Sequence, residues 1–134
     1  MIAFVDTSAF FATLDRDDAR HKDAAAAWRQ MLEKGVGIVT TNYVLLETSA
    51  LVQRRLGLRA LELFSSEILA VADVEWIDER RHRAAVEMTL AAGRKELSLV
   101  DCSSFLVMRE AGIRTVFCFD RHFEQQGFEV LPDP

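Results

Sequence analysis

The chain has 134 residues and a mass of 15.1 kDa, which is the size of one ordinary domain. Half of its residues are hydrophobic and 28% are charged, so the chain should bury a core without disulfides or a structural metal. Its formal net charge of −5 argues against a broad electrostatic grip on nucleic acid, which needs a basic face, but leaves room for a local basic track.

The two cysteines, Cys102 and Cys118, lack the spacing of a zinc site. Both lie in apolar segments, so we expect buried free thiols in a reducing compartment. No apolar run reaches the roughly 18 residues that a membrane span requires, and residues 1–5 look like a strand rather than a signal peptide. The composition therefore predicts a cytoplasmic protein that forms a single domain over residues 1–134.

Short β-rich runs alternate with longer helical stretches along the chain. Strands are predicted at residues 2–5, 37–40, 74–77, 115–119 and 128–131, and helices at about 7–14, 19–34, 42–56, 58–71, 79–93 and 101–111. Four predicted helices end at a glycine, as a left-handed cap favours: Gly35, Gly57, Gly93 and Gly112. Helices inserted between strands imply a parallel sheet with right-handed crossovers, so the predicted class is α/β.

Two aspartates directly follow predicted strands. Asp6 comes after Ile2–Val5, and Asp120 comes after the run 115–119. Because the carboxyl ends of parallel strands lie on one edge of a sheet, we expect both side chains on that edge. Taken singly, each residue has a plainer interpretation, since Asp6 would cap the following helix and Asp120 would start a turn.

Two further acids lie on predicted helices. Glu47 has four neighbours at helical spacing that are apolar or nearly so: Tyr43, Val44, Ala50 and Leu51. This pattern predicts that Glu47 faces the buried side of its helix, where a carboxylate needs a cation, a proton or a salt bridge to a distant arginine. Asp101 stands at the start of the helix predicted at 101–111, where a simple N-cap is the alternative.

Four carboxylates brought together would raise one another's pKa values unless a cation lies between them. A set of oxygen ligands without cysteine or histidine suits Mg²⁺ or Mn²⁺ better than zinc. A divalent ion held in this way activates water and offsets charge on a transferring phosphoryl group. The acids therefore indicate a metal-dependent phosphodiester hydrolase.

Four segments resemble, in chain order, the signature of the PIN-domain family. They are the opening Val5-Asp6-Thr7-Ser8, the helix that carries Glu47, the stretch 97–105 around Asp101, and Phe119-Asp120-Arg121-His122-Phe123. A lone Asp-Thr-Ser would carry no information, whereas four acidic motifs in order with the expected elements are a specific match over essentially the whole chain. The likeness is to bacterial VapC-type ribonuclease toxins of VapBC toxin–antitoxin systems.

This resemblance implies a three-layer α/β/α fold around a five-stranded parallel sheet in the order 3-2-1-4-5. It also implies Mg²⁺- or Mn²⁺-dependent cleavage of a structured RNA, a tRNA or an rRNA, which inhibits translation. Asp6, Glu47 and Asp101 match the acids of the metal centre, Asp120 matches a fourth acid that acts through water or as an orienter, and Ser8 matches a supporting hydroxyl. A VapB-type antitoxin and a homodimer are the implied protein partners.

The sequence departs from the family pattern on either side of the last aspartate. Many members have threonine two residues before it and aspartate two residues after it, where this chain has Cys118 and His122. The number of metal ions and the role of Asp120 therefore stay open. His122 as a general acid is one interpretation, but a lone histidine in a turn is more often structural.

Basic residues stand close to several of these motifs. Arg121 follows Asp120 directly and is the residue that we predict to contact substrate phosphate. The cluster at residues 80–83 is more typical of a solvated helix face. The helix predicted at 58–71 has a wide apolar stripe, most of which ordinary core packing explains.

Other classes fit the residues less well. A phosphoacceptor domain needs paired acids after strand one and a lysine after strand five, and a haloacid-dehalogenase-type phosphatase needs a second aspartate where Ser8 stands. The remaining alternative is a catalytically silent PIN-type module that binds RNA or a protein partner.

Overall fold

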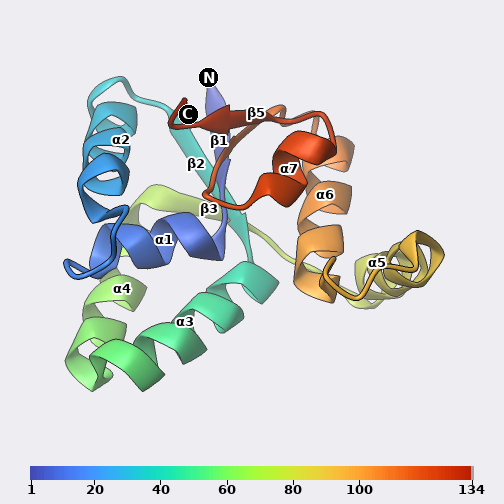
Figure 1. Cartoon of the computed structure of the whole chain (residues 1–134), viewed down its shortest axis with the longest axis horizontal. Coiled ribbons are helices and arrows are strands. Elements are labelled where there is room, and N and C mark those ends of the chain that lie inside the picture. The colour runs from blue at the N-terminus through green and yellow to red at the C-terminus, as the bar shows by residue number, and fades with distance from the viewer. Residues whose placement is uncertain (134) are drawn as a thin grey trace.

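Within residues 1–133, the part of the chain that the computed structural model describes, five parallel strands form one sheet (Figure 1). The strands are β1 (Ile2–Val5), β2 (Gly37–Thr41), β3 (Ala72–Glu75), β4 (Thr115–Phe117) and β5 (Glu129–Leu131). Their order across the sheet is β3-β2-β1-β4-β5, which confirms the order that the family resemblance implied. The central pair β1 and β4 is in a register that sets Val5 opposite Phe117.

Helices flank the sheet on both sides and complete the predicted three layers. They are α1 (Thr7–Leu14), α2 (His21–Glu33), α3 (Asn42–Leu56), α4 (Leu58–Val71), α5 (Glu79–Ala92), α6 (Leu99–Ala111) and α7 (Arg121–Gln125). In Figure 1, α1 and α2 lie on one side of the central strands, α6 and α7 lie on the other, and α5 extends beyond α6. Residues that follow β1 line a pocket together with residues of α3 and of the start of α6.

Several element boundaries differ from those predicted, each for a local reason. The third strand pairs two residues earlier than expected, because Ile77 leaves the sheet and its backbone N–H donates to the side chain of Asn42 (2.6 Å). The fourth strand ends at Phe117, because the Phe119 N–H donates to the hydroxyl of Ser8 (2.9 Å) instead of to a neighbouring strand. The short helix α7 was not predicted.

The core is built on fully buried residues of β1 and β4 and on a group of phenylalanines from the C-terminal third. Phe123 on α7 is 0% exposed, and its ring lies 5.0 Å from that of Phe105 and 6.4 Å from that of Phe4, centroid to centroid. Phe128 packs against Phe105 and Phe123 in turn. This packing fixes α7, which has only five residues, against the sheet edge.

We predict that Phe123→Ala lowers the free energy of unfolding by about 3–5 kcal/mol, because it removes a large, fully buried ring from a close-packed core. Urea denaturation followed by circular dichroism measures the change. The matched control is Leu90→Ala on α5, where the leucine is 75% exposed and the expected change is within about 0.5 kcal/mol. Equal effects of the two substitutions would contradict the packing described for α7.

Candidate active site

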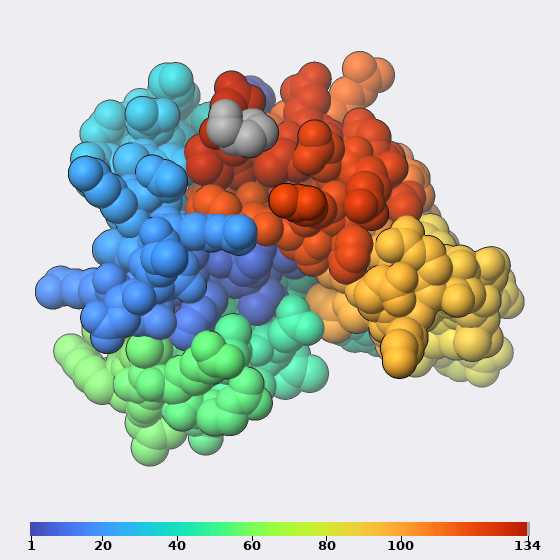
Figure 2. Space-filling model, in the orientation of Figure 1, coloured from blue at the N-terminus to red at the C-terminus, as the bar shows by residue number. Residues whose placement is uncertain are grey.

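One pocket brings the four predicted acids together at the carboxyl edge of the sheet. Asp6 follows β1 directly, and its backbone N–H donates to Phe117 O (3.1 Å), which continues the β1–β4 pairing up to the acid. The pocket has a volume of about 540 Å³, and its lining includes Asp6, Ser8, Glu47, Asp101 and Asp120. In Figure 2 the early part of the chain, in dark blue, is visible between the teal and green atoms of α3 and the orange atoms of the C-terminal third.

Asp6 lines this pocket and is only 4% exposed. It occupies the N-cap position of α1, but its side chain makes no capping hydrogen bond. Instead, the hydroxyl of Ser8 donates to Asp6 Oδ2 (3.2 Å) and accepts from the Phe119 N–H (2.9 Å). Asp6 is thus the N-cap of α1 by position, but its carboxylate does not cap the helix and bonds to Ser8 instead. The supporting role of Ser8 in the site stays a prediction.

Burial and neighbouring charge raise the pKa of two of the acids. Burial, followed by the Asp101 carboxylate, raises the pKa of Asp6 to about 7. Burial and then the Asp120 carboxylate also raise the pKa of Asp101, against the opposing hydrogen bonds from Ser98 and His122. The ionised forms of these carboxylates are thus destabilised in the metal-free protein.

Asp101 is the third residue of α6, and it lies in a capping box with Ser98. The Asp101 N–H donates to Ser98 Oγ (3.0 Å), while the Ser98 N–H donates to Asp101 Oδ2 (3.4 Å). Ser98 is thus the cap, and the expectation that Asp101 begins the helix was wrong by two residues. The box fixes the side chain of Asp101 toward the pocket.

Asp120 caps the short helix α7, since its Oδ1 accepts the His122 N–H (2.8 Å). The imidazole of His122 then lies between two acids: its Nδ1 is 3.3 Å from Asp101 Oδ2 and 3.2 Å from Asp120 Oδ1. One ligand atom from each of these three residues lies within 4.8 Å of the others. The thiol of Cys118 donates to the Asp120 carbonyl (3.5 Å), which further supports this turn.

Glu47 lines the pocket but is exposed, so the prediction that it lies on a buried helix face was wrong. The buried face of α3 consists of Val44, Thr48 and Val52, which are spaced four residues apart. Glu47 stands about 100° away from Thr48 around the helix. Its apolar neighbours Ala50 and Leu51 line the same pocket instead of the core.

Two threonines that sequence reasoning missed hold α3 against the start of α1. Thr48 Oγ1 donates to Thr7 Oγ1 (3.0 Å), and Thr7 Oγ1 donates to Val44 O (3.5 Å). Thr48 is 0% exposed. The sequence alone does not reveal this role of Thr48, because a small residue on a helix face is also typical of an ordinary core position.

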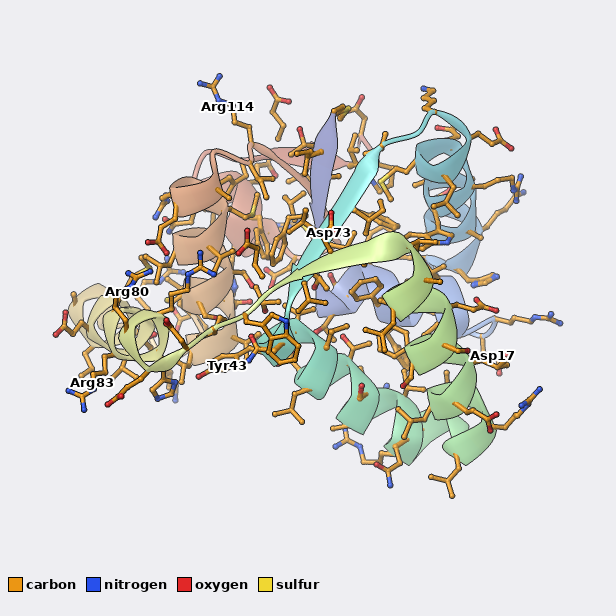
Figure 3. The ribbon with its side chains drawn as sticks, turned by 180° about the vertical axis from the view of Figure 1, so that it is seen from behind. Asp17, Tyr43, Asp73, Arg80, Arg83 and Arg114 are labelled. Carbon is orange, nitrogen blue, oxygen red and sulfur yellow. The ribbon has the colours of Figure 1, made fainter. Side chains whose placement is uncertain are left out.

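The basic residues divide between this pocket and other surfaces. Arg54, two turns after Glu47 on α3, lines the acidic pocket. Arg121 is exposed and lines a neighbouring pocket that shares only Asp120 with the acidic one, so its predicted phosphate contact stays a prediction. Figure 3 shows Arg80 and Arg83 on α5; both are exposed and paired with glutamates, as expected of a solvated helix face. Arg81 of the same cluster departs from this expectation, because its side chain is only 17% exposed and pairs with Glu75 and Glu110.

The residues of the pocket fit a hard divalent cation. Oxygen ligands dominate, and Asp6 and Asp101 are buried carboxylates that lie close to one another and to Asp120. Within residues 1–133, His122 is the sole basic group within ion-pair distance of any of the four acids. A bound Mg²⁺ or Mn²⁺ would relieve both the mutual repulsion and the cost of burying charge.

The fold and the site agree with a known family. The family model described as the PIN domain matches residues 3–129. The chain belongs to the PIN-domain family.

Relatives that align with this chain over nearly its whole length are VapC toxins. The chain is 37% identical over 132 residues to the 23S rRNA-specific endonuclease VapC20 of two Mycobacterium tuberculosis strains, CDC 1551 / Oshkosh and ATCC 25618 / H37Rv. These alignments cover 97% of this chain and 98% of the relative. The crystal structure of M. tuberculosis VapC20, described as a sarcin-ricin-loop-cleaving toxin, superposes with a TM-score of 0.85 at 36% identity and covers 96% of both chains.

We predict that the metal-free protein loses stability as the pH rises from about 4 to 7. The raised pKa of Asp6 means that the folded protein binds more protons than the unfolded chain in this window, so the free energy of unfolding falls with rising pH. A shift from 3.8 to about 7 corresponds to a loss of up to about 4 kcal/mol. Urea denaturation in EDTA at several pH values measures it.

The substitution that tests this prediction is Asp6→Asn, which removes the charge and keeps an oxygen for the Ser8 hydroxyl. It should flatten the pH dependence and make the metal-free protein more stable than the wild type at pH 8. The control is Asp17→Asn, in the exposed turn between α1 and α2 (Figure 3) and not among the residues that line the pocket. A wild-type stability that rises between pH 4 and 7 would contradict the prediction.

Proposed function

We propose that this chain is a Mg²⁺- or Mn²⁺-dependent endoribonuclease and the toxin of a type II toxin–antitoxin pair. One observation carries the proposal: four carboxylates line a single pocket, with no arginine or lysine paired to them in residues 1–133, in a PIN domain that aligns with an rRNA-specific endonuclease over nearly its whole length. Buried acids held together in this way are costly to fold, which points to selection for a bound cation.

Each acid has a role in this proposal. Asp6 and Asp101, the two buried carboxylates, hold the ion together with Asp120, and Glu47 reaches the pocket from the exposed side of α3. When bound, the divalent ion supplies an activated water for attack on phosphorus and neutralises charge on the phosphoryl oxygens. Ser8 orients Asp6 through the hydrogen bond already described.

The proposed substrate is the sarcin-ricin loop of 23S rRNA, the target that the names of the VapC20 relatives state. The net charge of −5 predicts weak nonspecific binding to RNA, because few basic groups are left over to neutralise phosphates. A narrow target recognised by shape and by a few contacts agrees with this charge.

The partners and location belong to the same proposal. A VapB-type antitoxin would bind and block the toxin, which would act as a single-domain homodimer in the cytoplasm. On α4, Phe64 and Ile68 are in the core, whereas Leu58 and Leu69 are 70% and 64% exposed, so core packing does not account for the whole stripe. None of the helices within residues 1–133 is long and apolar enough to cross a membrane.

We predict that the purified protein cleaves 23S rRNA in intact ribosomes in the presence of Mg²⁺ or Mn²⁺ and that EDTA abolishes the cleavage. Asp101→Asn should lower the rate by more than about 100-fold, because even groups that only orient metal ligands are worth 10–100-fold. Primer extension across the whole rRNA measures the cleavage. The control is Asp73→Asn on the edge strand β3, an exposed acid remote from the pocket that should leave the rate unchanged.

Mapping of new RNA 5′ ends after induced expression in a bacterium extends the test beyond one substrate. Discrete new ends outside 23S rRNA would support the nuclease and replace the proposed target. The absence of new ends from folded wild-type protein, both in this assay and on ribosomes, would overturn the proposal in favour of the silent binding module.

A separate prediction concerns the contribution of Arg54 and Arg121 to RNA binding. Because Arg54 shares the pocket with the acids, Arg54→Ala should weaken RNA binding about three- to tenfold and lower the slope of log affinity against log salt by about 1. Arg121→Ala should also weaken RNA binding, but by less, because Arg121 lines the neighbouring pocket and not the acidic one. Fluorescence anisotropy with a hairpin RNA of the sarcin-ricin sequence, in an Asp101→Asn background that prevents cleavage, measures both, and the reverse ranking would favour Arg121 as the phosphate contact.

A further inference from the structure

The imidazole of His122 occupies an unusual position between two carboxylates of the acidic pocket. We propose that His122 Nδ1 is a direct ligand of the metal ion held by Asp101 and Asp120, so that the centre has a mixed nitrogen and oxygen donor set. This inference rests on the proposed metal-dependent function and adds a ligand and a metal preference to it.

The backbone of α7 fixes the direction of this side chain. Asp120 Oδ1 accepts the His122 N–H (2.8 Å), which orients the first turn of the helix. The next residue, Phe123, is 0% exposed and packs among the phenylalanines of the core, so the helix is not free to rotate. The His122 side chain is itself only 22% exposed, and its Nδ1 lies beside the carboxylates of Asp101 and Asp120.

The distances fit neighbouring ligands of one ion. Mg²⁺ binds oxygen at about 2.0–2.1 Å in octahedral geometry, which places adjacent ligand atoms about 3.0 Å apart. His122 Nδ1 lies 3.2 Å from Asp120 Oδ1 and 3.3 Å from Asp101 Oδ2. A single Nδ1–H would have to be divided between two nearly equidistant oxygens, whereas one ion beside all three atoms satisfies each of them.

The second ring nitrogen of His122, Nε2, is free to carry the proton of a neutral imidazole while Nδ1 binds the metal ion. Within residues 1–133, His122 Nε2 has no protein hydrogen-bond partner, and all its side-chain contacts to the acids are made through Nδ1. A neutral imidazole that binds metal through one nitrogen carries its proton on the other. The exposed fraction of the side chain allows water to accept that proton's hydrogen bond.

The donor set sets the expected metal preference. Carboxylates and water suit Mg²⁺, while an imidazole nitrogen favours the transition ions along the series that runs from Mn²⁺ upward. We therefore expect tighter binding of Mn²⁺ than of Mg²⁺. Removing the imidazole should reduce this difference, because the remaining ligands are all oxygens.

Pulsed electron paramagnetic resonance of the full-length protein loaded with Mn²⁺ tests the ligand directly. Protein made with ¹⁵N-imidazole histidine and protein of natural abundance should differ in the nitrogen coupling at Mn²⁺. His122→Asn should abolish this label-dependent coupling. The same substitution should weaken the binding of Mn²⁺ by at least about tenfold, since the loss of an outer-shell partner alone lowers metal affinity 10–100-fold. It should change the affinity for Mg²⁺ less.

The matched control is His82→Asn on α5, which removes a different histidine, one that hydrogen-bonds Tyr43 and, within residues 1–133, pairs with none of the four acids. This variant should keep the full nitrogen coupling. Circular dichroism confirms that both variants are folded.

Two results would overturn the inference. If Mn²⁺ binds and Asp101→Asn removes it, but no imidazole coupling is seen in the wild type, His122 is a positioning residue and the nuclease proposal stands. If Mn²⁺ does not bind at the acids at all, the ligand inference fails together with the metal part of the proposed function, while ribosome cleavage in EDTA independently reports whether the chain cuts RNA without metal.

Discussion

The pairing of β1 with β4 is the constraint on which the site depends. It places Asp6 at the sheet edge with Phe117, Phe119 and Asp120 beside it, and it buries the Asp6 carboxylate. Ionised carboxylates that line one pocket repel one another, and burial adds to the cost of ionising them. The hydrophobic core around the strands supplies the free energy that holds them there.

Each of the remaining acids is aligned by a local device that is also structural. Asp101 completes the capping box of α6, Asp120 caps α7, and the threonine pair on α1 and α3 holds the helix that carries Glu47. The same hydrogen bonds that satisfy helix ends therefore set the directions of the ligands. A substitution at Ser98 or Thr48 is thus expected to change both helix stability and site geometry.

Much of this arrangement follows from the sequence, and the exceptions have physical reasons. The long helices follow from apolar periodicity, and Asp6 and Asp120 follow from the rule for parallel strand ends. The order of the strands came from the family resemblance, since periodicity carries no information on it. Glu47 was misplaced because apolar neighbours indicate a buried face only when they face the core, and here Ala50 and Leu51 face the pocket. The contact of His122 with Asp101 spans 21 residues and has no local signal.

The pocket joins the two ends of the chain. Ser8 binds the backbone of Phe119, a residue 111 positions later, and β1 finds its central partner only in β4. During synthesis, a nascent chain that stops before residue 101 has at most two of the four acids, and β4 emerges from the ribosome later still. A nascent chain therefore carries all four acids only once residue 120 has been made. For an enzyme whose proposed target is ribosomal RNA, the order of the elements along the sequence delays completion of the acidic centre until most of the PIN domain has been synthesised.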